Sequence, residues 1–153
     1  MEKAVAAASL PSADMVADLA ILHEGLAAGR EGSHDDQAAA RYYALALGLD
    51  GDNIKAQVGR LRRVDRDATK AMHDSQRAKA TKKKNEGDDS DNDPEQIRRS
   101  MCAVIEDVGR KAEAVVASGC GYFDAADCET TRGFALNYAL RRVLPPLARK
   151  WSC

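Results

Sequence analysis

Apolar side chains recur three or four residues apart along most of this chain, which is the period of an amphipathic helix. The first such stripe begins after a possible N-cap at Ser12 and ends at Gly29. Its members are Met15, Leu19, Leu22 and Leu26. No segment alternates apolar and polar residues in the way that a half-buried strand requires, so the pattern predicts an all-α protein.

A second helix is predicted from an N-cap at Asp35 or Asp36 to Leu49, where the turn 50–53 ends it. Its residues are apolar almost all round, and a helix without a polar face normally lies between two neighbours. A third helix should begin near Ile54, with a narrower apolar stripe and basic residues around it.

The C-terminal half predicts a helical pair behind a charged linker. Residues 78–92 have no apolar periodicity, whereas Asp93 and Pro94 form a strong helix start. That helix should run to Ser118, and a last helix, capped by Asp124 or starting nearer Thr130, should break at the proline pair 145–146. The predicted organisation is a flexible lead (1–11), a three-helix unit (12–77), a disordered linker (78–92) and a helical pair (93–153).

Composition adds that the core must be thin. Alanine accounts for 28 of the 153 residues, so the 44% of hydrophobic residues contains few large side chains. The net charge is only -1, but residues 60–84 hold 10 basic and 3 acidic groups. Such a block is usually a solvated face and sometimes a site for a polyanion.

The residues Ala39, Tyr43 and Ala46, followed by the 50–53 turn, resemble the second helix and exit turn of a tetratricopeptide repeat (TPR). Residues 20–53 would then be one degenerate repeat, and the third helix resembles the polar helix that caps such arrays. The resemblance implies a helical hairpin that binds other proteins. The three-helix microtubule-interacting and trafficking (MIT) domain has a similar shape and stays open as an alternative.

No catalytic or metal-binding constellation can be assembled from the sequence. His23-Glu24 lacks the second histidine of a zinc-protease helix, and Cys120 and Cys128 have no histidine at ligand spacing. We therefore expect no enzyme, no cofactor, no metal and no small-molecule substrate. The leading hypothesis is a non-catalytic interaction or scaffold subunit of a larger assembly. The expected partner-binding residues are Leu26, Tyr42, Tyr43, Leu47, Met101, Val104 and Val108.

An alternative is a nucleic-acid-associated factor that binds the phosphate backbone through the basic segment 60–84. The residues in question are Arg60, Arg62, Arg63, Arg66, Lys82, Lys83 and Lys84. The four cysteines follow no close-pair spacing, which suggests a reducing compartment and thus the cytoplasm or nucleus. Cys120 and Cys128 are expected to be small buried side chains or free thiols. No uncharged stretch approaches the roughly 20 residues that span a bilayer, so membrane insertion is not expected.

Overall fold

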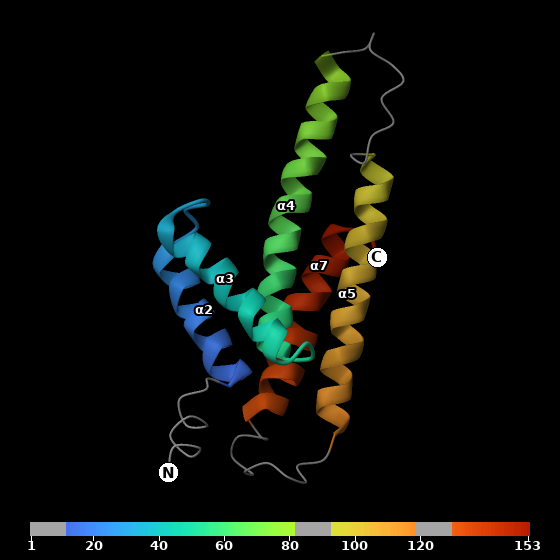
Figure 1. Ribbon diagram of the computed structural model, residues 1–153. Helices are drawn as coiled ribbons and strands as arrows, with labels where there is room; N and C mark the ends of the chain where they lie inside the picture. Colours follow the sequence, from blue (N-terminus) through green and yellow to red (C-terminus); the bar gives the residue numbers. More distant parts are fainter. Residues whose placement is uncertain (1–11, 82–92, 119–129) are drawn as a thin grey trace, which may run out of the picture. The chain divides into compact units, whose positions relative to one another are not determined.

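A computed structural model describes residues 12–81, 93–118 and 130–153, and within these ranges it consists of helices joined by turns, with no strand (Figure 1). The predicted all-α class is thereby confirmed. The helices are α2 (Ala13–Ala27), α3 (His34–Leu49), α4 (Ile54–Thr81), α5 (Pro94–Ala117), the π-helix η1 (Phe134–Val143) and α7 (Leu144–Lys150). The predicted flexible lead lies outside the described residues, as does the linker from residue 82 onward.

The chain divides into an N-terminal unit, Met1–Arg60, and a C-terminal unit, Leu61–Cys153. The division falls inside α4, whereas the sequence suggested a boundary at 78–92. Beyond Arg60, α4 is tied to the C-terminal tail, because the side chains of Asp65 and Thr69 accept hydrogen bonds from Lys150. Helical geometry also extends to Thr81, four residues past 77, where the sequence predicted that the three-helix unit ends.

Helix starts are fixed by side chains that accept backbone N–H groups. Ser12 caps α2 and Asp93 caps α5, as the sequence predicted. The predicted N-cap of α3 is wrong: Ser33 accepts the N–H of Asp36, while the Asp36 carboxylate accepts the N–H of Gly32 at 2.8 Å. This reciprocal pairing satisfies two donors at once, so Asp36 is more useful in the first turn than at the cap.

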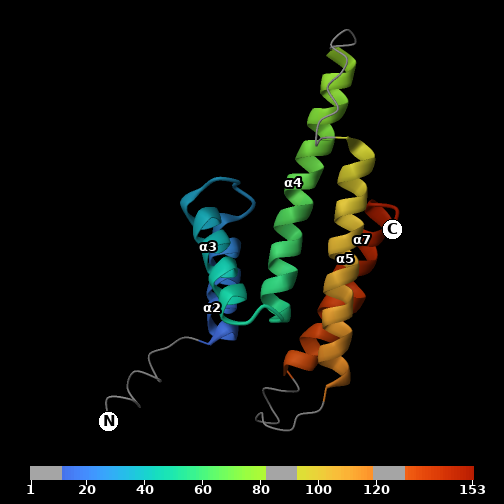
Figure 2. The same cartoon turned by 45° about the vertical axis from the view of Figure 1, so that its right-hand side comes forward.

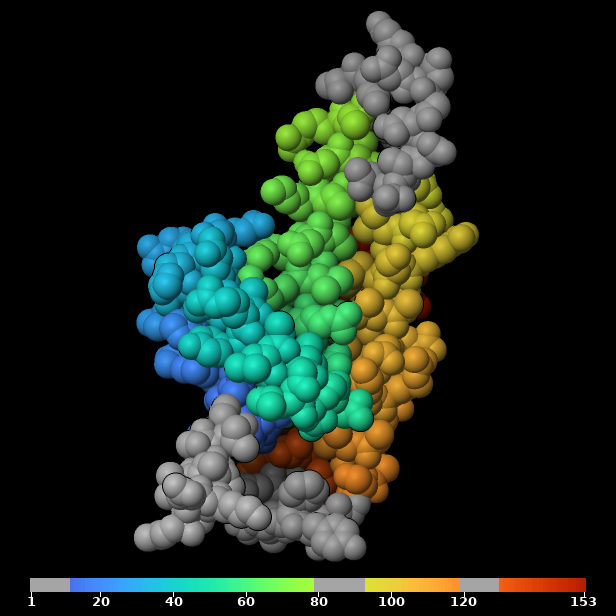
Figure 3. Space-filling model, in the orientation of Figure 1, coloured from blue at the N-terminus to red at the C-terminus, as the bar shows by residue number. Residues whose placement is uncertain are grey.

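The core of the N-terminal unit consists mainly of alanines at the α2–α3 interface. Figures 2 and 3 show the two helices in contact along the hairpin. Alanine loses no side-chain entropy on burial and lets two helices approach closely. The cluster comprises Val16, Ala17, Ala20, Ala39, Tyr43, Ala46 and Ala56.

In the C-terminal unit, the buried residues of α5 are Ile97, Met101, Ile105, Val108 and Ala112, whereas Val104 is only half-buried. Figures 1 and 2 both show α7 beside α5, and Lys150 at the end of α7 donates a hydrogen bond to Asp65 of α4. Trp151, the C-cap residue of α7, is 5% exposed. Its indole N–H donates to Asp65 at 2.8 Å, a contact between residues 86 positions apart.

The last helix departs from the prediction in two ways. The prolines 145 and 146 stand in the first turn of α7 and do not end a helix, because a first turn needs no N–H from these positions. Before them, Phe134–Val143 forms a π-helix, in which Leu144 N–H bonds to the carbonyl of Ala139 five residues back. The buried residues Ala135, Ala139 and Leu144 are spaced four and five apart, which is wider than the 3.6 residues of an α-helical turn.

A disulfide joins Cys102 on α5 to Cys153, with a Cα–Cα distance of 5.6 Å. The sequence did not predict this pairing, because the spacing of the four cysteines had suggested a reducing compartment. A separation of 51 residues gives no local spacing signal, so the pairing becomes visible only when the tail folds back on α5. Cys120 and Cys128 lie outside the described residues.

Candidate protein-binding surface

The large side chains of α2 point away from the core, against the usual orientation of an apolar stripe. The alanines and Val16 face α3, while Met15, Leu19, Leu22 and Leu26 are 65, 37, 56 and 53% exposed. The inner face of α2 is occupied by small residues that set the close helix spacing, so no room is left there for leucines. The stripe predicted from the sequence exists, and it lies on the outside.

Two leucines of α3 lie on the same side of the hairpin as this stripe. His23 and Tyr42 stack across the hairpin with ring centroids 5.4 Å apart. His23 is four residues after Leu19, and Tyr42 is three residues before Leu45, so each ring neighbours an exposed leucine on its own helix. Leu45 and Leu49 are 48 and 51% exposed. We call the six side chains the apolar face: Met15, Leu19, Leu22, Leu26, Leu45 and Leu49.

Tyr43 fixes the hairpin to the first turns of α4. Its ring is 2% exposed, and its hydroxyl donates to Glu24 Oε1 at 3.1 Å. The ring lies so close to Gly59 that a Cβ added there would overlap it, with Tyr43 Cδ1 at 2.7 Å. The prediction that α3 lies between two neighbours therefore holds for the face that carries Tyr43, whereas Leu45 and Leu49 on another face are about half exposed.

Carboxylates gather where α2 begins and α3 ends. Asp14 accepts a hydrogen bond from the Asn53 amide, and Asp18 pairs with Lys55 at 3.1 Å while its side chain stays 60% exposed. Asp50 and Asp52 are exposed in the turn that follows α3. Among the residues that the structure describes, four carboxylates and one lysine therefore lie around the end of the apolar face that holds Met15 and Leu49.

The predicted partner-binding residues fall into two groups. Leu26 is exposed, and Tyr42, Leu47 and Val104 are half-buried. Tyr43, Met101 and Val108 are 1 to 2% exposed and belong to the chain's own cores. Tyr43, Met101 and Val108 were chosen because they are large and apolar, which marks a core residue as readily as an interface residue. The exposed members of the apolar face other than Leu26 were missed as binding residues.

The predicted basic surface is partly used within the chain. Arg62 is half-buried, and its guanidinium carbon lies 5.0 Å from the centroid of the Tyr138 ring, within the range of a cation–π contact. Arg63 and Arg66 are half-buried, and Arg60 is exposed. Lys82, Lys83 and Lys84 lie outside the described residues.

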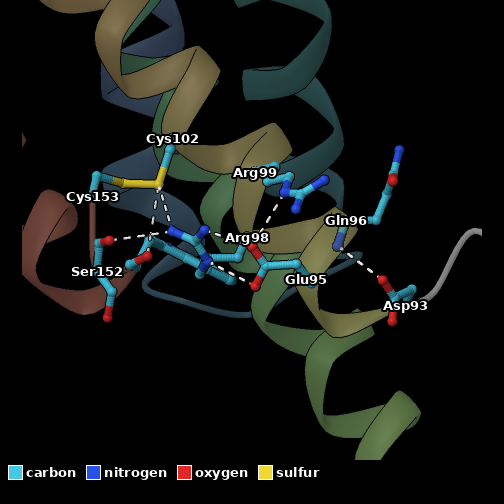
Figure 4. A network of polar contacts seen from close by, with 9 residues as sticks. Asp93, Glu95, Gln96, Arg98, Arg99, Cys102, Ser152 and Cys153 are labelled. Carbon is cyan, nitrogen blue, oxygen red and sulfur yellow. Dashed lines mark hydrogen bonds and ion pairs between the residues drawn. A yellow bond between two sulfur atoms is a disulfide. The ribbon is translucent and has the colours of Figure 1, made fainter.

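A polar network holds the C-terminus against α5 (Figure 4). Arg98 donates to the carbonyl of Ser152 at 3.2 Å and to Glu95 Oε2 at 2.6 Å, next to the Cys102–Cys153 disulfide. The hydrogen bond from Arg98 lowers the pKa of Glu95 below its usual 4.5, with smaller contributions from Arg99. Since Glu95 is near the N-terminus of α5, its charge also suits the helix dipole. This network anchors the tail to the first turns of α5.

The described residues contain no group of three or more His, Cys, Asp or Glu side chains placed to hold a metal ion. No helix of the described part of the chain is long and apolar enough to cross a membrane. Comparison with protein-family models, with curated proteins and with solved structures finds no significant match. The resemblance to a TPR hairpin or an MIT domain thus stays a prediction.

Proposed function

We propose that this chain is a non-catalytic protein-binding subunit whose contact surface is the apolar face of the α2–α3 hairpin. The observation that supports this most is the exposure of six large aliphatic side chains, between 37 and 65%, on one side of a two-helix unit. Contiguous exposed apolar surface is costly in water and typically marks an interaction site. A scaffold role within a larger assembly fits the thin alanine core, which leaves the large side chains available for a partner.

The Cys102–Cys153 disulfide supports an oxidising compartment for the protein. The cytoplasm or nucleus was expected on the basis of reduced cysteines, so we propose an oxidising compartment in their place. Mass spectrometry of protein alkylated before reduction, isolated from its native source, tests this. Recovery of Cys102 and Cys153 as alkylated thiols would contradict it.

Site-specific photo-crosslinking tests the binding function. A photo-reactive amino acid replaces Leu22 in the full chain, and the matched control carries it at Ile21, which is 39% exposed on a different face of α2. In native extract we expect a discrete crosslinked protein from position 22 and none from position 21. Equal labelling from both positions, or none from position 22, would contradict the proposal.

A further inference from the structure

We infer that the occupant of the apolar face is a single amphipathic α-helix of a partner protein, with basic residues beside its apolar stripe. This inference rests on the proposed binding function and specifies the partner's chemistry. The α2 stripe has the spacing four, three, four, which is the a/d pattern of a helix that packs along another helix. Leu45 and Leu49 supply a second row on α3, so a partner helix would lie between two rows of leucines.

The length of the apolar face fits one helix. The stripe extends from Met15 to Leu26, nearly the whole of the 15-residue helix α2. At about 1.5 Å per residue, a partner helix of three to four turns would cover it. Such an amphipathic helix needs no further secondary structure to present an apolar stripe to the two leucine rows.

Charge decides between a basic partner and other occupants. Asp18 and Asp50 are exposed at the end of the face that holds Met15 and Leu49. The described N-terminal unit, residues 12–60, contains eight Asp or Glu residues and four Lys or Arg residues, so its net charge is -4. In a dimer formed through this face, two units that each carry a net charge of -4 would face each other, and like charges repel. Lysines or arginines on a partner helix would instead meet the exposed aspartates.

Peptide binding to the full chain tests both parts of the inference. The probes are three helical peptides of the length of α2 that share one leucine stripe and carry lysine, glutamine or glutamate beside it. Calorimetry should give about tenfold tighter binding for the lysine peptide than for the glutamate peptide. This preference should shrink when salt rises from about 0.05 M to about 0.5 M, because screening weakens exposed charge pairs.

Matched variants connect this binding to the apolar face. Leu22→Gln and Leu45→Gln should each lower the affinity for the lysine peptide about tenfold, whereas Ile21→Gln should change this affinity less than twofold. Asp18→Asn together with Asp50→Asn should remove the preference for lysine over glutamate. Unchanged circular dichroism of each variant shows that the variant is folded. Because the two leucine variants lie on different helices, the test does not depend on a single substitution.

Three results would overturn the inference: no binding of the lysine peptide, equal binding of the three peptides, or sedimentation that shows a dimer which Leu22→Gln converts to a monomer. The last result would assign the surface to a second copy. If position 22 crosslinks a protein in extract while the lysine peptide does not bind, the binding function stands and only the basic helix is wrong.

Discussion

Substituting Gly59 by alanine should destabilise the N-terminal unit, although glycine in a helix interior is normally unfavourable. An added Cβ would overlap the Tyr43 ring, and even Cδ1 would be only 2.7 Å away, against about 3.5–4.0 Å for carbon atoms in contact. Both partners are buried, so the ring has little room to move. Overpacking of this kind costs up to about 3 kcal/mol. Alanine regains about 1 kcal/mol of helix propensity, which leaves a net loss of up to about 2 kcal/mol.

Gly48 is the matched control for this substitution. It lies in α3 with no atom within 4 Å of an added Cβ, so Gly48→Ala should raise stability by up to about 1 kcal/mol. Hydrogen exchange of the α2 and α3 amides, measured together with urea unfolding, reports the N-terminal unit locally. Tyr43→Leu should then cost less in the Gly59→Ala background than in the native chain, since leucine vacates part of the overlap.

If Gly59→Ala stabilises the chain as much as Gly48→Ala, the close approach of Tyr43 to α4 is refuted. Tyr43 would then not fix the hairpin to the first turns of α4. An additive double mutant would lead to the same conclusion, because residues in contact should show a coupling energy.

Three further predictions concern the C-terminal unit. Cys153→Ser should lower stability by about 4 kcal/mol, from the loop entropy of a 51-residue separation from Cys102, and a reductant should destabilise the native chain but not the variant. Trp151→Phe removes an N–H donor to a carboxylate and should cost about 1.5 kcal/mol or more in urea unfolding, with unchanged stability as the contradicting result. The hydrogen bond from Arg98 lowers the pKa of Glu95, so the ionised Glu95 side chain stabilises the folded chain. This stabilisation is fully present above the unfolded pKa near 4.5 and is lost as the pH falls through the folded pKa. Glu95→Gln should therefore flatten the acid limb of the stability curve, and an unaltered limb would contradict this.

Local patterns in the sequence were sufficient for the helices and for most of their ends. The 3.6-residue period needs only neighbouring positions, and so do the caps at Ser12 and Asp93. The prolines 145 and 146 were misplaced because the same residue that ends one helix also begins the next. The π-helix was missed because it differs from an α-helix only in which carbonyl each N–H selects.

The candidate binding surface could be predicted only in part. The stripe of Met15, Leu19 and the leucines that follow was readable from its spacing, but its direction was not. An amphipathic pattern states that one face is apolar, without stating whether that face meets the chain's own core or another protein. Alanine is less hydrophobic than leucine, yet it occupies the core of the hairpin. The reason is that two closely packed helices have room between them only for small side chains.

By itself, the sequence determined an all-α chain, its helix periods, its acidic N-terminal and basic middle segments, and a thin supply of large side chains. Only the tertiary structure decided that alanines pack inward and leucines face outward, that Gly59 receives the Tyr43 ring, and that Trp151 and Cys153 return to α4 and α5. The reason is range: caps and periods depend on residues a few positions apart, whereas these contacts join residues 16 to 86 positions apart, whose meeting depends on the packing of whole helices.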